Sequence, residues 1–151
     1  MDLECTFRKA TLDDAGEIAR LSTQLGYPAN AATMRERLAT ILRNAEHLVL
    51  VAEQRPILVA WIHACRFRTV ESGLRLEIAG FVVDEGHRRR GVGRALVERV
   101  EDWGVTQQAP AVRVRCNIKR SESHQFYEAL GYKRIKTQIA FEKPLSPVAT
   151  A

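Results

Sequence analysis

Cysteine is scarce in this sequence. Cys5, Cys65 and Cys116 are odd in number, lie far apart along 151 residues and form no Cys-x-x-Cys pair. This pattern argues against a disulfide framework and against a zinc site, so we expect reduced thiols. The four histidines show no metal-ligand spacing to one another or to cysteine, and we expect no metal.

Long apolar runs are also missing. The apolar runs are much shorter than a membrane span, and residues 1–4 lack the basic and apolar regions of a signal peptide. We therefore expect a cytoplasmic protein with no membrane partner. With 46% hydrophobic residues, the length fits one domain over residues 3–145, followed by a disordered tail over 146–151.

Two familiar nucleotide-binding motifs are absent. No Gly-x-x-x-x-Gly-Lys-Ser/Thr run occurs, and a dinucleotide fingerprint would need a glycine where Leu96 stands. The sequence instead contains Arg88-Arg89-Arg90-Gly91-Val92-Gly93 directly before an amphipathic run. A helix start has backbone N–H groups without intrahelical partners and a partial positive charge, and glycines let a phosphate approach closely. This stretch predicts a phosphate cradle at a strand-to-helix turn.

Periodicity predicts the order of the elements. Apolar residues at helical spacing predict helices over 12–25, 31–44, 92–108 and 121–130. Short apolar and β-branched runs predict strands over 7–10, 47–53, 57–68, 74–83, 111–116, 132–135 and 138–143. The segment that precedes the cradle is the buried central strand, and Gly80 within it marks a bulge or a close backbone approach.

The cradle resembles the acetyl-CoA pyrophosphate loop of the GNAT family of N-acetyltransferases, Arg/Gln-x-x-Gly-x-Gly/Ala after an apolar strand. A second motif, Phe126-Tyr127-Glu128-Ala129-Leu130-Gly131-Tyr132, is similar to the Phe/Leu-Tyr-Glu-x-Leu-Gly-Phe/Tyr segment of that family. The resemblance implies an α/β GNAT fold. Its mixed, mostly antiparallel sheet of about six to seven strands has helices on both faces and a splayed central strand pair.

The resemblance also implies where acetyl-CoA binds. The pantetheine arm would contact the central strand, and the pyrophosphate would lie on the cradle. The residues so assigned are Phe81, Val82, Val83, Arg88, Arg89, Arg90, Gly91, Val92, Gly93 and Arg94. Many family members carry an asparagine seven residues before the tyrosine, where this chain has Arg120, so Arg120 or Asn117 is expected to take its place.

Two residues are candidates for catalysis. Acetyl transfer to an amine requires a group that takes the amine proton and a group that protonates the departing thiolate. Glu77 lies fourteen residues before Gly91, at the position of the family's general base, although it also fits a solvent-facing strand residue. Tyr127 matches the family's proton donor, although helical spacing would also fit a core aromatic residue.

The function implied is acetyl-CoA-dependent acetylation of a small primary amine by direct attack on the thioester. The Asn117 segment is similar to a subset that includes aminoalkylphosphonate and aminoglycoside N-acetyltransferases. The net charge of +5 leaves open a protein that binds RNA or acetylates charged tRNA, and a peptide acceptor is also open. Nucleic acid is disfavoured, and a homodimer is compatible with the sequence. Clustering of Arg35, Arg37, Arg43, Arg66 and Arg68 around the acceptor mouth would favour RNA.

Overall fold

The computed structural model describes residues 4–147. The chain divides into two compact units at the boundary between Arg115 and Cys116, and each is described here by itself. The first unit contains β1 (Thr6–Lys9), α1 (Ala15–Gln24), α2 (Ala31–Ile41), β2 (His47–Gln54), β3 (Ile57–Thr69), β4 (Gly73–Val83), α3 (Val92–Thr106) and β5 (Val112–Val114). Short 3₁₀ turns, Leu12–Asp14 and Glu85–His87, precede α1 and α3. The second unit contains α4 (Ser121–Ala129).

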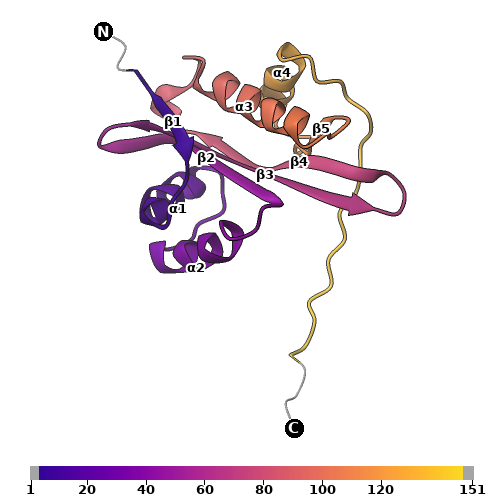
Figure 1. Ribbon diagram of the computed structural model, residues 1–151, viewed down its shortest axis with the longest axis horizontal. Helices are drawn as coiled ribbons and strands as arrows, with labels where there is room; N and C mark the ends of the chain where they lie inside the picture. Colours follow the sequence, from indigo (N-terminus) through magenta and orange to yellow (C-terminus); the bar gives the residue numbers. More distant parts are fainter. Residues whose placement is uncertain (1–3, 148–151) are drawn as a thin grey trace. The chain divides into compact units, whose positions relative to one another are not determined.

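One mixed sheet organises the first unit. Its strands lie in the order β1-β2-β3-β4-β5, and every neighbouring pair is antiparallel except β4 and β5, which are parallel. In Figure 1, α1 and α2 lie on one side of this sheet and α3 lies on the other. The α/β fold class expected from the sequence is confirmed, with helices on both faces.

The two faces of β3 and β4 differ in burial. Side chains toward α3 are fully or almost fully buried, as in Ile62, Ala64, Leu76 and Ile78. A side chain at Gly104 of α3 would already meet Leu76 and Val112, which shows how closely α3 packs on the sheet. The opposite face is buried against α1 and α2 at Val49, Val51 and Val82, but it is only half-buried farther along the strands. The sheet therefore has one closed face and one partly open face.

The start of the first helical segment is held by an ion pair. Arg8 on β1 donates two hydrogen bonds of 2.8 Å to the Asp14 carboxylate, which also accepts the Thr11 N–H at 2.8 Å. Burial alone would raise the pKa of Asp14, but these hydrogen bonds outweigh it and hold the pKa below its usual value. Thr11 and Asp14 form the capping box that joins this turn to β1.

The central strand pair is splayed. β5 pairs with β4 only from Leu76 to Ile78, whereas β4 continues to Val83. On its other edge β4 pairs with β3 to the end, with a register shift that leaves Ala79 as a bulge beside Gly80. The expected splay after the first part of β4 is therefore present.

The strands expected over 132–135 and 138–143 are wrong. Residues 133–147 form no helix or strand, so the described chain has a sheet of five strands rather than six or seven. The alternating apolar residues favoured strands, but a strand is stable only when it pairs with another and covers an apolar face. Here Ile139 is 80% exposed and Phe141 91% exposed, and this segment pairs with no strand in the described residues. The single domain over 3–145 remains a prediction, and most of the tail expected over 146–151 lies outside the described residues.

Candidate active site

The start of α3 lies where the sequence predicts a phosphate cradle. Gly91 caps the helix at φ = 80°, a left-handed conformation that a glycine adopts without strain, and no side chain caps the helix. The first α3 hydrogen bond runs from the Ala95 N–H to the Gly91 carbonyl, so the N–H groups of Val92, Gly93 and Arg94 precede the intrahelical pattern. A Cβ atom built at Gly91 would enter open space, which leaves room for a phosphate at this end.

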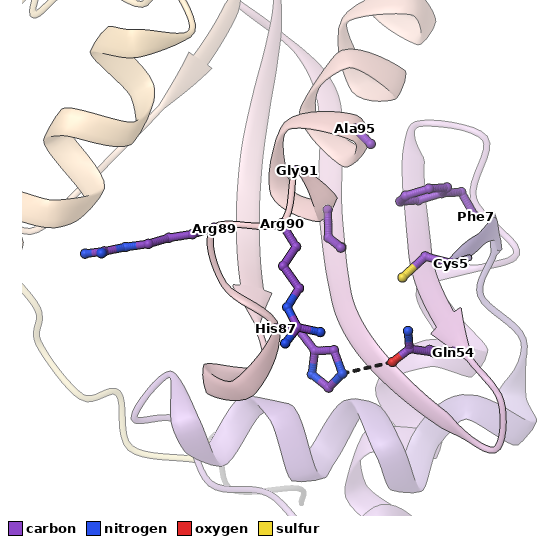
Figure 2. A pocket seen from close by; sticks show the side chains of 9 residues that line it. Cys5, Phe7, Gln54, His87, Arg89, Arg90, Gly91 and Ala95 are labelled. Carbon is purple, nitrogen blue, oxygen red and sulfur yellow. Dashed lines mark hydrogen bonds between the residues drawn. The ribbon is translucent and has the colours of Figure 1, made fainter. Parts of the chain in front are cut away.

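The three arginines before the cradle point in different directions. Arg88 donates to the Val83 carbonyl at 3.3 Å and so lies back along β4. In Figure 2, Arg89 extends away from the other labelled side chains, whereas Arg90 points toward His87 and Gln54. Arg90 lines a hollow of about 470 Å³ between β1 and the start of α3, together with Cys5, Phe7, Gln54, His87, Arg89, Gly91, Val92 and Ala95. The arginines therefore surround the cradle rather than forming one clamp.

A hydrogen-bond network fixes the loop between β4 and α3. Asp84 accepts from Gln24 of α1 and from His87, both at 2.8 Å, and His87 also contacts Gln54 Oε1 at 3.0 Å. The Glu85 N–H donates to Gln24 Oε1 at 3.1 Å. The hydrogen bond from Gln24, more than that from His87, holds the pKa of Asp84 below its usual value. The sequence analysis missed this network because its members come from three separate segments: α1, β2 and the loop before α3.

The β4 residues assigned to the pantetheine arm have different exposures. Val82 is almost completely buried in the core beneath α1, so only its backbone could meet a ligand. Phe81 and Val83 are half-buried. All three lie beyond the last β4–β5 pair, in the part of β4 that the splay opens. Their contact with acetyl-CoA remains a prediction.

Glu77 lies in the middle of the partly open face of the sheet. Its side chain is 15% exposed and pairs with Arg115 at 3.4 Å between Oε1 and Nη2. The strand registers place Cys65 of β3 opposite Glu77 and His47 of β2 opposite Cys65, and on the other side Arg113 of β5 opposite Glu77. Paired residues of neighbouring strands point to the same face, so these four side chains form one row across the sheet.

Two histidines and one tryptophan extend this face. His47 Nδ1 and His63 Nε2 are 2.9 Å apart, and the rings stack with centroids 5.1 Å apart. Burial, and to a lesser extent the charge of His47, lowers the pKa of His63 to about 4. Trp61 lies over Gly80, where a Cβ atom would come within 2.8 Å of the indole ring. Gly80 thus leaves room for the close approach of Trp61, which agrees with the close approach expected at this glycine, although the sequence did not identify Trp61 as the neighbour.

No thiol of the chain is activated. Burial raises the pKa of Cys5, Cys65 and Cys116, and the charge of Glu77 raises that of Cys65 further. Within residues 4–147, no group of three or more His, Cys, Asp or Glu side chains is arranged to hold a metal ion. No helix of that same range is both long and apolar enough to cross a membrane.

The second unit carries the remaining predicted site residues. Tyr127 is 8% exposed and makes edge-to-face contacts with Phe126 and Tyr132. Burial, assisted by Cys116, raises the pKa of Tyr127 well above its usual value. The Asn117 side chain accepts the Lys119 N–H at 2.9 Å, and Arg120 is the N-cap residue of α4. Asn117 therefore has a local role in the turn before α4.

The sequence model described as the acetyltransferase (GNAT) family matches residues 13–132. The chain belongs to this family. A curated rice protein (Oryza sativa subsp. japonica), acetyl transferase GW6a, is 36% identical over an alignment of 85 residues, and the match covers 48% of this chain and 20% of the relative. The GNAT chain thus spans about a fifth of that relative's length.

Solved structures show the same GNAT fold. The aminoglycoside 6'-N-acetyltransferase AAC(6')-IG from Acinetobacter haemolyticus superposes with a TM-score of 0.81 at 19% identity, covering 93% of this chain and 99% of that chain. AAC(6')-Iy in complex with the bisubstrate analogue CoA-S-monomethyl-acetylneamine superposes with a TM-score of 0.83 at 17% identity, covering 94% and 99%. At these identities the likeness concerns the fold.

Proposed function

We propose that this GNAT protein transfers the acetyl group of acetyl-CoA to a small primary amine. The observation that carries the proposal is the position of the glycine-capped start of α3, which follows the part of β4 that β5 leaves unpaired. The glycine-capped start of α3 suits a pyrophosphate. The unpaired part of β4 suits an extended arm that ends in a thioester. The complex of AAC(6')-Iy with a CoA-linked analogue supports a ligand of this class on the same fold.

The proposed reaction is direct. The neutral amine nitrogen attacks the thioester carbonyl carbon, a C–N bond forms and the C–S bond breaks. Glu77 accepts the amine proton, and the CoA thiolate receives a proton from the Tyr127 hydroxyl. The raised pKa of Tyr127 keeps this hydroxyl protonated until the thiolate leaves. The raised pKa of each cysteine disfavours an acetyl-cysteine intermediate, because the thiolate is the nucleophilic form.

The arginines that would indicate RNA do not form one patch. Arg35, Arg37 and Arg43 belong to α2 or directly follow it, whereas Arg66 points to the α3 face. Arg66 donates to Glu46 at 2.7 Å and to Gln107 at 2.6 Å, so its charge is already compensated. A small acceptor is therefore the better-supported proposal, and cytoplasmic location is proposed with it.

Replacement of Glu77 tests the reaction. If the carboxylate takes the amine proton, the acid limb of the pH–rate profile reports its ionisation, so Glu77→Gln should lower the rate and abolish that limb. Release of the CoA thiol at several pH values measures this. Glu71→Gln, in the exposed turn before β4, is the matched control and should leave the profile unchanged. An acid limb that persists in Glu77→Gln would remove Glu77 from the chemistry.

A further inference from the structure

His87 lies between two hydrogen-bond acceptors in the loop that leads to α3. Its Nδ1 atom is 2.8 Å from the Asp84 carboxylate, and its Nε2 atom is 3.0 Å from Gln54 Oε1. A neutral imidazole has one N–H group and can donate to only one of these oxygens, whereas an imidazolium donates to both. The arrangement of acceptors around His87 therefore fits the protonated ring.

The Asp84 carboxylate is placed to stabilise that proton. The side chains of His87 and Asp84 are 18% and 17% exposed, so solvent screens their ion pair only in part. The hydrogen bond from Gln24, assisted by that from His87, holds the pKa of Asp84 below its usual value. Asp84 is thus an anion at neutral pH, and Arg20 of α1 is a second cation beside it, 3.5 Å from Oδ1.

Positive charge on the other side of His87 opposes its protonation. Figure 2 shows Arg90 pointing toward His87, and both line the hollow of about 470 Å³ beside Gly91, as does Arg89. Arg90 forms no ion pair within residues 4–147, and no Asp or Glu of that range lines the hollow. Burial raises the pKa of the Cys5 thiol, which lines the hollow in its neutral form. The repulsion from Arg90 is therefore not offset on this side.

A phosphate group bound at the start of α3 changes this balance. His87 precedes Gly91 by four residues and lines the same hollow, so an anion there lies near both His87 and Arg90. Its negative charge offsets the repulsion between the two cations and favours the protonated ring. Linkage is reciprocal, so the protonated ring favours the bound anion to the same extent.

We propose that His87 is a positioning residue for acetyl-CoA. In its imidazolium form it ties the loop before α3 to Asp84 and Gln54 and adds a positive charge beside the phosphate cradle. Above the pH at which the ring loses this proton, Nε2 becomes an acceptor that faces Gln54 Oε1, one hydrogen bond of the loop is lost, and acetyl-CoA binds more weakly. This inference rests on the proposed acetyltransferase function and assigns a coupled proton to its binding step.

Calorimetric titration with acetyl-CoA between about pH 6 and pH 9 tests this role. We expect the wild-type Kd to rise by about threefold to tenfold over this range relative to that of His87→Gln, whose amide donates a hydrogen bond but cannot bind a proton. Titrations in buffers of different ionisation enthalpy count the protons taken up on binding. Since the phosphates of acetyl-CoA titrate in both experiments, the wild-type protein should exceed His87→Gln by a fraction of a proton.

Asp84→Asn provides a second variant with a predicted direction. The amide keeps the shape of the side chain but lacks the charge that stabilises the proton, so Kd should begin to rise at lower pH than in the wild type. His47→Gln is the matched control, because it removes a histidine that contacts His63 on the opposite face of the sheet. This control should keep the wild-type pH dependence, and circular dichroism checks that each variant is folded.

The outcomes separate the inference from the function on which it rests. Equal proton uptake and an equal pH dependence of Kd in the wild type and His87→Gln would overturn the role of His87, even if the variant bound more weakly at every pH. If His87→Gln does not fold, an unchanged pH profile in Asp84→Asn overturns the same role. Failure of the wild-type protein to bind acetyl-CoA at any pH would instead overturn the proposed function.

Discussion

At the scale of single residues, the environment decides the role that each side chain can play. Cys65 and Glu77 are cross-strand partners on the same face, yet burial and the neighbouring carboxylate raise the pKa of the thiol. Tyr127 is a phenol whose pKa is likewise raised by burial. A thiol that stays protonated is a poor nucleophile, whereas a phenol that stays protonated can donate its proton to a stronger base such as a thiolate.

Tyr127→Phe tests the proton donor because it removes only the hydroxyl group. We expect the rate of acetyl transfer to fall by roughly two orders of magnitude while acetyl-CoA affinity is retained. Stopped-flow measurement of thiol release and calorimetry with acetyl-CoA would give the two quantities. Phe126→Leu, at the adjacent half-buried position, is the control for packing on α4. Full activity of Tyr127→Phe would leave Tyr127 as a core aromatic residue.

At the scale of elements, sequence patterns predicted most boundaries in the first unit. The cradle helix begins at Val92 as expected, and the central strand covers 73–83. The strand expected over 111–116 is shorter, from Val112 to Val114, and α2 ends at Ile41. Periodicity locates an element from the residues of that element alone. The length of a strand, however, depends on the neighbouring strand with which it pairs. The register of β4 with β5, which places Arg113 beside Glu77, could not be predicted for the same reason.

The start of α3 provides a test of the acetyl-CoA assignment. Gly93 lies in the first turn of α3, so Gly93→Val places a branched side chain where a phosphate would approach. We expect acetyl-CoA binding in calorimetry to be lost or reduced at least a hundredfold. Gly91 is unsuitable for this test because its φ of 80° would strain any other residue.

Gly16→Ala is the control for the glycine replacement. Gly16 lies in α1, and a Cβ atom there meets nothing within 4 Å. This variant should bind acetyl-CoA normally and gain roughly 0.5–1 kcal/mol in unfolding free energy from helix propensity. Unchanged acetyl-CoA affinity in a folded Gly93→Val protein would contradict the cradle assignment.

At the scale of the whole molecule, the sequence predicted the family fold but gave too many strands. Ile139 and Phe141 have the i, i+2 spacing of a strand face, and yet both are exposed. Alternation shows that a segment could cover an apolar face, but not that a sheet edge receives it. The cradle and the catalytic candidates could be found because their motifs are local. The arginines around Glu77 and the loop network were missed because three-dimensional pairing brings them together.

The stability of the fold should depend on pH through His63. Its pKa is lowered from 6.5 to about 4 by burial and by the charge of His47, with Cys65 and Glu77 on the same face. Between these two values the unfolded chain binds more protons than the folded chain, so the unfolding free energy decreases as pH falls from 6.5 to 4. Asp14 changes the unfolding free energy in a lower pH range than His63. Because the pKa of Asp14 is lowered in the folded protein, this carboxylate stabilises the fold above about pH 3.8, and the stabilisation is lost as the pH falls further.

Urea unfolding at several pH values between 4 and 7 would isolate the contribution of His63. We expect the wild-type protein to lose on the order of 1 kcal/mol over this range on account of His63, after allowance for the partial exposure of the ring. His63→Gln keeps a polar group of similar reach toward His47 but cannot take up a proton, so its unfolding free energy should change less with pH. The same pH dependence in both proteins would show that the proton uptake on unfolding comes from other groups, and that His63 is not held neutral by its position between β2 and β4.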